Sequence, residues 1–558
     1  MRLNPSALAA LGALGLASAC GRDSSGPSPS SACGAPGTQL SLVVAAYVSL
    51  DPVLDSGGVT FAANSSSDTA EYLVLAQSAG GAAGSFAPFD LASASPSPSG
   101  PAPSFAARQA QASRAGGANG HTAVTFDMYL RSIGRAGRYP PVPLASPPVV
   151  SVPPRPAPTG PPALGSARTF KVCSNMSCSA LANVGATVRA VGAHIAIYVD
   201  TLAPAGGLDS ADYDALKQVF DTLLYPLDTA TFGSVSDVDA NTVVMVLMSN
   251  VVNRLVSNSR CISSGYIAGF FFPGDLDPGF AIQFNNGEVF YSIVADPGGT
   301  LSCSHSTGEV KNVMPVTFTH EFQHMINFVQ HVRIRGGDSE EGWLDEGLSK
   351  YAEEIAGRAF LPGDPASFSR YAIGSVYDAY QYLLDPGSSP LLIPADTGTL
   401  AEVGASWLFV RYLVDQFGVA LPGQLVQTAQ RGAANVSGRT GQPFAQTVSR
   451  WGLANWVSDL PGFAAPIELQ FNSWHFRATF GSLHDQDAAH FPLAYPLVPL
   501  VSNATAVDIG GTLWSGSGEY VRVVQPPGGA TFTLHLSANG TAPVSNAVVP
   551  RLNIVRIR

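Results

Sequence analysis

Charged residues are scarce in this chain. Lys, Arg, Asp and Glu make up 12% of the 558 residues, and 29 basic side chains stand against 40 acidic ones, for a net charge of −11. Nucleic acids and anionic lipid surfaces are bound mainly through clustered basic side chains. The composition therefore excludes a broad basic surface, and we expect no nucleic-acid partner.

Long apolar runs are also lacking beyond the N-terminus. A membrane-spanning helix needs about 18 or more consecutive apolar residues. The nearest internal candidate, Val243 to Val252, is interrupted by Ser249 and Asn250. The hydrophobic content of 46% is nevertheless enough for a large core, so we expect a soluble mature body of two or three domains.

The first residues have the pattern of an export signal. Arg2 precedes an apolar stretch from Ala7 to Leu16, and small residues lead to Cys20. The ending LASAC resembles a bacterial lipobox, which implies removal of residues 1–19, a lipid on Cys20 and a tether over 20–37. We expect an exported cell-envelope lipoprotein whose membrane contact is that lipid. An ordinary signal peptide and a secreted protein are the alternative.

Cysteine is rare, and no CxxC pair occurs among the six cysteines. This argues against a metal site built on paired cysteines. In an exported chain the cysteines are disulfide candidates instead. With Cys20 set aside, proximity in the sequence favours the pairs Cys173–Cys178 and Cys261–Cys303, which leaves Cys33 unpaired.

Composition divides the rest of the chain into four segments. Short apolar stretches between turn residues predict a small β domain over 38–92, and Pro, Ala and Ser dominate a linker over 93–165. Strands followed by helices predict an α+β domain over 166–461. Alternating residues in segments such as Glu519 to Val523 predict a β-rich C-terminal domain over 462–558.

Periodicity predicts the elements of the central domain. We expect strands over 190–200, 243–248, 266–272 and 288–293, and helices over 210–224, 315–332, 344–358 and 405–417.

The segment HEFQH carries the strongest chemical signal. His320 and His324 are four residues apart on a predicted helix, so both imidazoles project from one face and can bind one zinc ion. Glu321, beside them, is placed to take a proton from a water activated by the metal. A solvated His-Glu face is the alternative, but the apolar neighbours of this helix predict burial, where unpaired histidines are costly.

A third protein ligand must complete such a site. A histidine six residues after His324 would complete a different zinc motif, but Gln330 stands there and His331 lies one place too far. We expect His331 at the surface or behind the ligands. The carboxylate candidates are Asp338, Glu340, Glu341, Glu346 and Glu353.

Glu346 is the strongest of these candidates. It opens a second amphipathic helix in WLDEGLSKYAEE, where it can meet the first helix at the metal. Glu353 lies about 10 Å further along the same axis.

HEFQHMINF followed by WLDEGLSKYAEE resembles the gluzincin metallopeptidases, and most closely the hyicolysin-like family. The resemblance covers roughly residues 166–460. It implies a zinc peptidase in which His320, His324 and Glu346 bind one zinc ion and Glu321 is the general base. Asp345 stands where many relatives have Asn, which leaves the role of that side chain open.

The resemblance also implies a Tyr or His from a later helix that stabilises the oxyanion. Four tyrosines follow Glu346, and Tyr377 is our choice because it lies in the most tyrosine-rich segment. The others are Tyr371, Tyr380 and Tyr412.

The expected substrate is a protein or peptide. The GxMEN motif with which aminopeptidases bind a free N-terminus is absent, which favours endopeptidase action. A zinc exopeptidase, or a catalytically inactive lipid-tethered binding protein with a structural zinc, is the alternative.

Two further features of the sequence are weaker signals. Asp237, Asp239 and Asn241 have a spacing that suits calcium, with a plain Asx turn as the alternative. Asn285 to Glu288 could form the edge strand that aligns a substrate backbone.

Overall fold

The computed structural model describes residues 23–25, 38–54, 57–93, 126, 128–130, 132–133, 136, 139, 160–394, 398–540 and 542–558. The predicted signal segment, the lipidation site Cys20 and the unpaired Cys33 lie outside these residues, as does most of the predicted linker.

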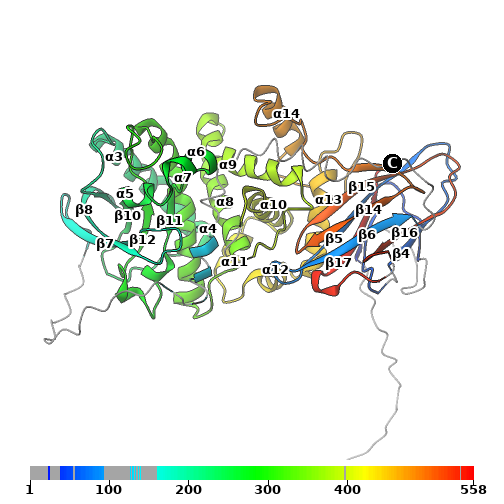
Figure 1. Cartoon of the computed structure of the whole chain (residues 1–558), viewed down its shortest axis with the longest axis horizontal. Helices are drawn as coiled ribbons and strands as arrows, with labels where there is room; N and C mark the ends of the chain where they lie inside the picture. The colour runs from blue at the N-terminus through cyan, green and yellow to red at the C-terminus, as the bar shows by residue number, and fades with distance from the viewer. Residues whose placement is uncertain are drawn as a thin grey trace, which may run out of the picture.

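The molecule is elongated, and its parts follow one another along the long axis (Figure 1). A mixed sheet lies at one end, a group of helices occupies the middle, and a β-sandwich forms the other end. The chain is therefore mixed α+β, as the sequence predicts. None of the helices in the described residues has the length and apolar character needed to cross a membrane.

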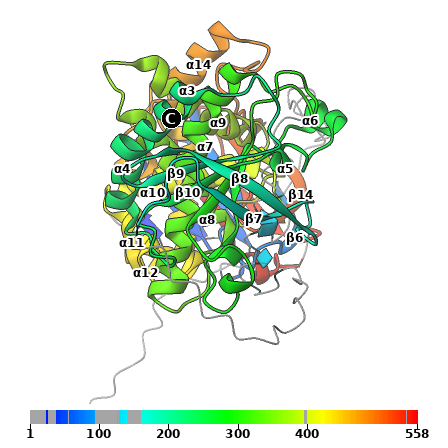
Figure 2. The same cartoon turned by 90° about the vertical axis from the view of Figure 1, so that its left-hand side faces the viewer.

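The mixed sheet has six strands in the order β11-β12-β10-β9-β8-β7. Strands β9, β10 and β12 are parallel, whereas β11, β8 and β7 run antiparallel to their neighbours. Seen from this end, β7 to β10 lie in front of the helices (Figure 2). The bounds are β7 Ala167–Cys173, β8 Leu181–Val191, β9 Ile195–Asp200, β10 Val244–Met248, β11 Gly269–Phe271 and β12 Val289–Ser292.

The helices pack on this sheet and on one another. Helix α7 covers one sheet face through aromatic pairs, with ring centroids 5.3 Å apart for Phe290 and Phe318. The main helices are α3 Ser210–Val219, α4 Tyr225–Phe232, α5 Asn250–Asn253, α6 Asn258–Ser264, α7 Thr307–Phe328, α8 Gly342–Arg358, α9 Pro365–Leu384, α10 Leu400–Phe417, α11 Leu421–Val426, α12 Gly432–Thr440, α13 Phe444–Val457 and α14 Phe476–Gln486.

Both ends of the chain build the sandwich. One sheet has the order β1-β3-β17-β5-β15-β13 and the other β14-β6-β16-β4-β2. The bounds are β1 Asp23–Ser25, β2 Thr38–Leu40, β3 Tyr47–Leu50, β4 Gly58–Phe61, β5 Ala70–Ser78, β6 Phe86–Ser93, β13 Leu500–Asn503, β14 Asp508–Trp514, β15 Gly518–Gln525, β16 Phe532–Ser537 and β17 Pro550–Arg556.

This pairing differs from the two separate β domains that the sequence suggests. Strand β5, from the N-terminal segment, lies between β17 and β15 of the C-terminal segment. Because these strands are joined by hydrogen bonds and their side chains share one hydrophobic core, the two segments form one sandwich.

The sandwich is attached to the helices through α13. The Tyr520 hydroxyl donates to the Gly452 carbonyl at 2.7 Å, and Ser49 Oγ lies 3.3 Å from Ser449 Oγ. Leu73 and Leu75 of β5 belong to the core shared with the helices. The sandwich is thus built into the molecule through a buried interface.

Several predicted elements differ in their bounds. The single strand predicted over 190–200 is a hairpin, because the backbone turns at Gly192 to His194, where Asp221 accepts hydrogen bonds from two amides. The helix predicted from Pro315 begins at Thr307, because Ser306 caps it. The strand predicted over 266–272 is shortened to β11.

Candidate metal centre

Helix α7 carries the HEFQH segment through the protein interior. Ser306 caps the helix by accepting a hydrogen bond from the Glu309 amide. His320, Glu321 and His324 lie about four to five turns after this cap, on the part of α7 that is buried between the sheet and α8. Helical spacing puts both imidazoles on one face, and the Nε2 atoms of His320 and His324 lie 3.1 Å apart.

Helix α8 brings Glu346 to the same point. Its carboxylate oxygens each lie 3.5 Å from an imidazole Nε2, with Oε2 near His320 and Oε1 near His324. The three side chains form a group that could hold a metal ion, with one potential ligand atom from each within 4.8 Å of the others. Two helices far apart in the sequence thus converge on one buried centre.

A carboxylate lies close to the Nδ1 atom of each imidazole. Glu353 Oε1 lies 2.7 Å from Nδ1 of His320, and Asp345 Oδ1 lies 3.1 Å from Nδ1 of His324. A carboxylate on Nδ1 fixes the imidazole tautomer and leaves the Nε2 lone pair for a metal. Both ring orientations therefore suit metal binding through Nε2.

Further polar groups hold these carboxylates. Lys350 Nζ lies 3.3 Å from Glu353 and 3.4 Å from Asp378, and Ser375 donates to Glu353 at 3.3 Å. Burial raises the pKa of Asp378 to about 6, although Lys350 opposes the shift. Burial also acts to raise the pKa of Glu353, but Lys350 and His320 outweigh it and the net pKa is lowered. Glu353 is thus held as an anion behind His320.

The centre favours positive charge. Burial alone would lower the pKa of His320, but Glu346 and Glu353 outweigh it and raise the pKa well above its usual value. Burial would raise the pKa of Glu346, yet the two histidines lower it. Several buried carboxylates around one point create the field in which a cation is stabilised.

Two carboxylate oxygens here have no hydrogen-bond partner within the described part of the chain. They are Oε2 of Glu321 and Oε1 of Glu346, and both are fully buried. A buried carboxylate oxygen without a partner is costly unless another species occupies the space. The residues therefore fit a bound cation together with a polar molecule beside Glu321.

The edge strand β11 runs beside Glu321. A Cβ atom on Gly269 would lie 3.7 Å from Glu321 Cγ and 2.5 Å from the Tyr291 carbonyl oxygen, so only glycine allows this approach. The prediction of an edge strand over Asn285 to Glu288 is wrong, because these residues belong to none of the sheets. The Asn285 side chain instead donates hydrogen bonds to Asp275 and to the Lys171 carbonyl, and the Glu288 carboxylate accepts one from the Ser236 hydroxyl.

Tyr377 is directed away from the side of α9 that faces Glu353 and Lys350. Ser375 and Asp378 of α9 face Glu353 and Lys350. Tyr377 lies between them in the sequence, so helical geometry places its side chain on another side of α9. The Tyr377 ring packs against Phe491 at a centroid distance of 5.8 Å. Sequence proximity to other tyrosines therefore carried no information about its direction.

His331 is buried rather than exposed. Its ring lies 3.8 Å from Glu340, and both side chains are inaccessible to solvent. Burial lowers the pKa of His331 to about 4, so the ring is neutral near pH 7. His331 therefore belongs to the polar interior behind the centre.

Sequence reasoning missed the supporting roles of Asp345, Ser349 and Glu353. Ser349 Oγ lies 3.0 Å from His324 Nδ1 and donates to the Asp345 carbonyl at 2.9 Å. The available signal was spacing, because positions 345, 346, 349 and 353 recur at three- and four-residue intervals along α8. They therefore face α7 together.

Two residues of the predicted calcium site, Asp237 and Asp239, lie close to a third carboxylate, that of Glu288. Asp237, Asp239 and Glu288 come within 4.8 Å of one another and form a group that could hold a metal ion. Protein donors already approach them: the Thr242 amide donates to Asp237, and Arg168 pairs with Asp239 at 3.3 Å. These contacts agree with the Asx-turn alternative.

No protein-family model matches the chain, and no curated protein is significantly similar to it.

Proposed function

We propose that this chain is a zinc-dependent peptidase of the gluzincin type, similar to the hyicolysin-like family, and that it cleaves proteins or peptides internally. The observation that carries the proposal is the convergence of two imidazole Nε2 atoms and the Glu346 carboxylate, with a carboxylate behind each imidazole. Such carboxylate–histidine pairs are typical of zinc centres.

The spacing of the ligand atoms supports zinc. Nitrogen and oxygen ligands lie about 2.0 to 2.2 Å from zinc, so tetrahedral neighbours are separated by roughly 3.3 Å. The three contacts among His320, His324 and Glu346 measure 3.1, 3.5 and 3.5 Å. Three protein ligands leave one position open, as in catalytic zinc sites.

The protein's own groups supply the remaining chemistry. A bound zinc ion would acidify a water molecule and polarise the substrate carbonyl. Glu321 accepts the proton of the attacking water and delivers it to the departing amine nitrogen. Its buried and unpartnered Oε2 is suited to this transfer, because no donor in the described residues competes for it. Asp345 and Glu353 keep the two imidazoles oriented.

The strand β11 supports action on extended peptides. Its position beside Glu321 at the edge of the sheet would let a substrate backbone add to the sheet next to the proton acceptor. An edge strand binds backbone groups independently of chain ends, which favours internal cleavage.

The Glu321→Gln variant tests the proposal. The mature chain and the variant are purified, their zinc content is measured, and their hydrolysis of casein and of end-blocked peptides is compared. We expect close to one zinc ion per chain in both proteins and a loss of about 10²-fold to 10⁴-fold in activity in the variant. Absence of zinc, or equal activity of the two proteins, would refute the proposal. Cleavage of free-ended peptides alone would indicate an exopeptidase.

A further inference from the structure

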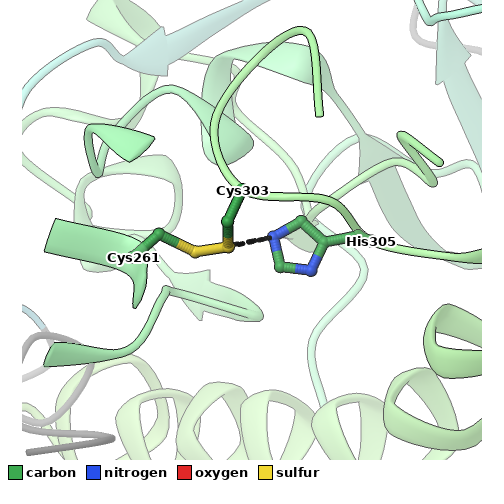
Figure 3. A group of neighbouring side chains, drawn as sticks. All are labelled: Cys261, Cys303 and His305. Carbon is green, nitrogen blue, oxygen red and sulfur yellow. Dashed lines mark hydrogen bonds between the residues drawn. A yellow bond between two sulfur atoms is a disulfide. The ribbon is translucent and has the colours of Figure 1, made fainter. Parts of the chain in front are cut away.

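A second cluster of metal-binding side chains lies just before helix α7. Cys261 and Cys303 form a disulfide, and His305 lies beside both sulfur atoms (Figure 3). Its Nε2 atom is 3.6 Å from the sulfur of Cys303 and 4.0 Å from that of Cys261. This cluster shares no residue with the centre at His320.

His305 is held as a metal-ligating imidazole would be. Its Nδ1 lies 3.2 Å from Glu309 Oε1, and the Tyr266 hydroxyl donates to the same oxygen at 3.2 Å. The Tyr266 ring also packs on the imidazole, with centroids 4.3 Å apart. When Nδ1–H donates to Glu309, the Nε2 lone pair points at the sulfurs, the tautomer that binds a metal.

In the disulfide form, the two sulfur atoms offer no hydrogen-bond donor to the Nε2 lone pair of His305. Disulfide sulfurs carry no hydrogen, and the His305 side chain is only 1% exposed, so Nε2 is shielded from bulk water. A metal ion bound by two thiolates and Nε2 would satisfy it. With metal–sulfur and metal–nitrogen distances of about 2.3 and 2.1 Å, tetrahedral sulfur and nitrogen ligands are roughly 3.5 Å apart, close to the distances found.

We propose that, after reduction of this disulfide, Cys261, Cys303 and His305 form a second metal site for a thiolate-binding cation such as Zn²⁺. Two molecules of a low-mass thiol reduce the disulfide to two cysteine thiols and leave as their own disulfide. Binding of the cation then releases the two thiol protons to solvent. Cys303 is partly exposed, so an incoming thiol can reach its sulfur.

The surrounding loop is held by contacts other than the disulfide. The Ser302 hydroxyl donates to the Val256 carbonyl at 2.6 Å, and Asn258 donates to the Ser302 carbonyl at 2.8 Å. The backbones of Asp296 and His305 also exchange two hydrogen bonds, of 2.8 and 3.0 Å. The sulfurs can therefore separate while the three ligands stay together.

Cadmium titration of the reduced chain tests this site. The parent is the full chain with Cys20→Ser and Cys33→Ser, reduced by a water-soluble phosphine that is then removed without oxygen. The thiolate-to-cadmium absorption in the ultraviolet reports only thiolate ligands, so the His320 centre does not contribute. We expect one Cd²⁺ per chain with this absorption.

Variants identify the ligands. Cys173→Ser/Cys178→Ser removes the other reduced cysteine pair and should retain the two-thiolate signal as the matched control, and Cys303→Ser added to it should abolish the signal. His305→Ala should weaken cadmium affinity at least tenfold, and Glu309→Gln about tenfold. Unchanged affinity in His305→Ala, no absorption in the folded reduced parent, or loss of the circular dichroism of the fold on reduction would each overturn the proposal.

Discussion

The Nδ1 atom of His320 lies 2.7 Å from Oε1 of Glu353, on the opposite side of the imidazole from Glu346. Glu353 therefore acts on the ring and not on the metal position, although both glutamates come from α8. Lys350 Nζ lies 3.3 Å from Glu353 and forms an ion pair with it. Glu346 is thus the proposed ligand and Glu353 the group that orients His320, and mutations should distinguish these two roles.

Removing Glu346 should weaken zinc binding far more than removing Glu353. Glu346→Ala deletes a proposed ligand, whereas Glu353→Ala removes an outer partner, a change that typically costs 10-fold to 100-fold in metal affinity. Competition with a coloured zinc chelator measures both affinities. The reverse order would assign the third ligand to Glu353.

Zinc affinity should survive replacement of the Asp345 carboxylate by an amide but not its removal in an alanine variant. Asn can still accept a hydrogen bond from Nδ1 of His324, so Asp345→Asn should keep zinc affinity within a few-fold. Asp345→Ala should lower it by 10-fold to 100-fold. The exposed Asp214, which pairs with Lys217, provides Asp214→Ala as a control without effect. Equal losses in the two Asp345 variants would contradict the orienting role.

Stability should depend on pH through Glu340. Burial raises the pKa of Glu340 to about 8 from an ordinary value of 4.5, despite donors that include Asn435. The folded state therefore binds this proton more tightly than the unfolded state. Its contribution is complete below about pH 4.5, falls as the pH rises, and is lost by about pH 8.

Glu340→Gln removes this titration. Relative to the variant, the parent should lose a few kcal/mol of unfolding free energy between pH 5 and pH 9, because each pKa unit corresponds to about 1.4 kcal/mol. Urea unfolding of both metal-free proteins at the two pH values measures the difference. A difference that stays constant with pH would show that Glu340 does not titrate in this way.

Cleavage between the N-terminal strands and the part of the chain that begins at residue 160 should not separate them. Strand β5 pairs with both β15 and β17, so a nick within residues 94–159 leaves its hydrogen bonds intact. With a specific protease site inserted there, the fragments should separate on a denaturing gel and elute together in size-exclusion chromatography. Deletion of residues 38–93 should give insoluble protein, because it exposes the faces of β15 and β17. Separate elution of the fragments would contradict this architecture.

The centre itself was largely predictable from the sequence. Four-residue spacing puts His320 and His324 on one helical face wherever that helix lies, and α8 begins close to its predicted start. Both proposed disulfides, Cys173–Cys178 and Cys261–Cys303, are also present. These features depend on local periodicity or on short separations along the chain.

Tyr377 and the sandwich show where the sequence is insufficient. The direction of Tyr377 depends on how α9 is rotated against α8, and the pairing of β5 with β17 joins segments more than four hundred residues apart. Neither is encoded in a local pattern, because alternating residues describe a strand equally well whatever its partner.

The sequence alone determined which residues form the candidate metal-binding motif, because helical geometry fixes their spacing. Only the tertiary structure decided which carboxylate faces the metal position and which stand behind the imidazoles. That choice depends on the packing of α8 against α7, where Glu346 reaches both Nε2 atoms while Asp345 and Glu353 meet the two Nδ1 atoms.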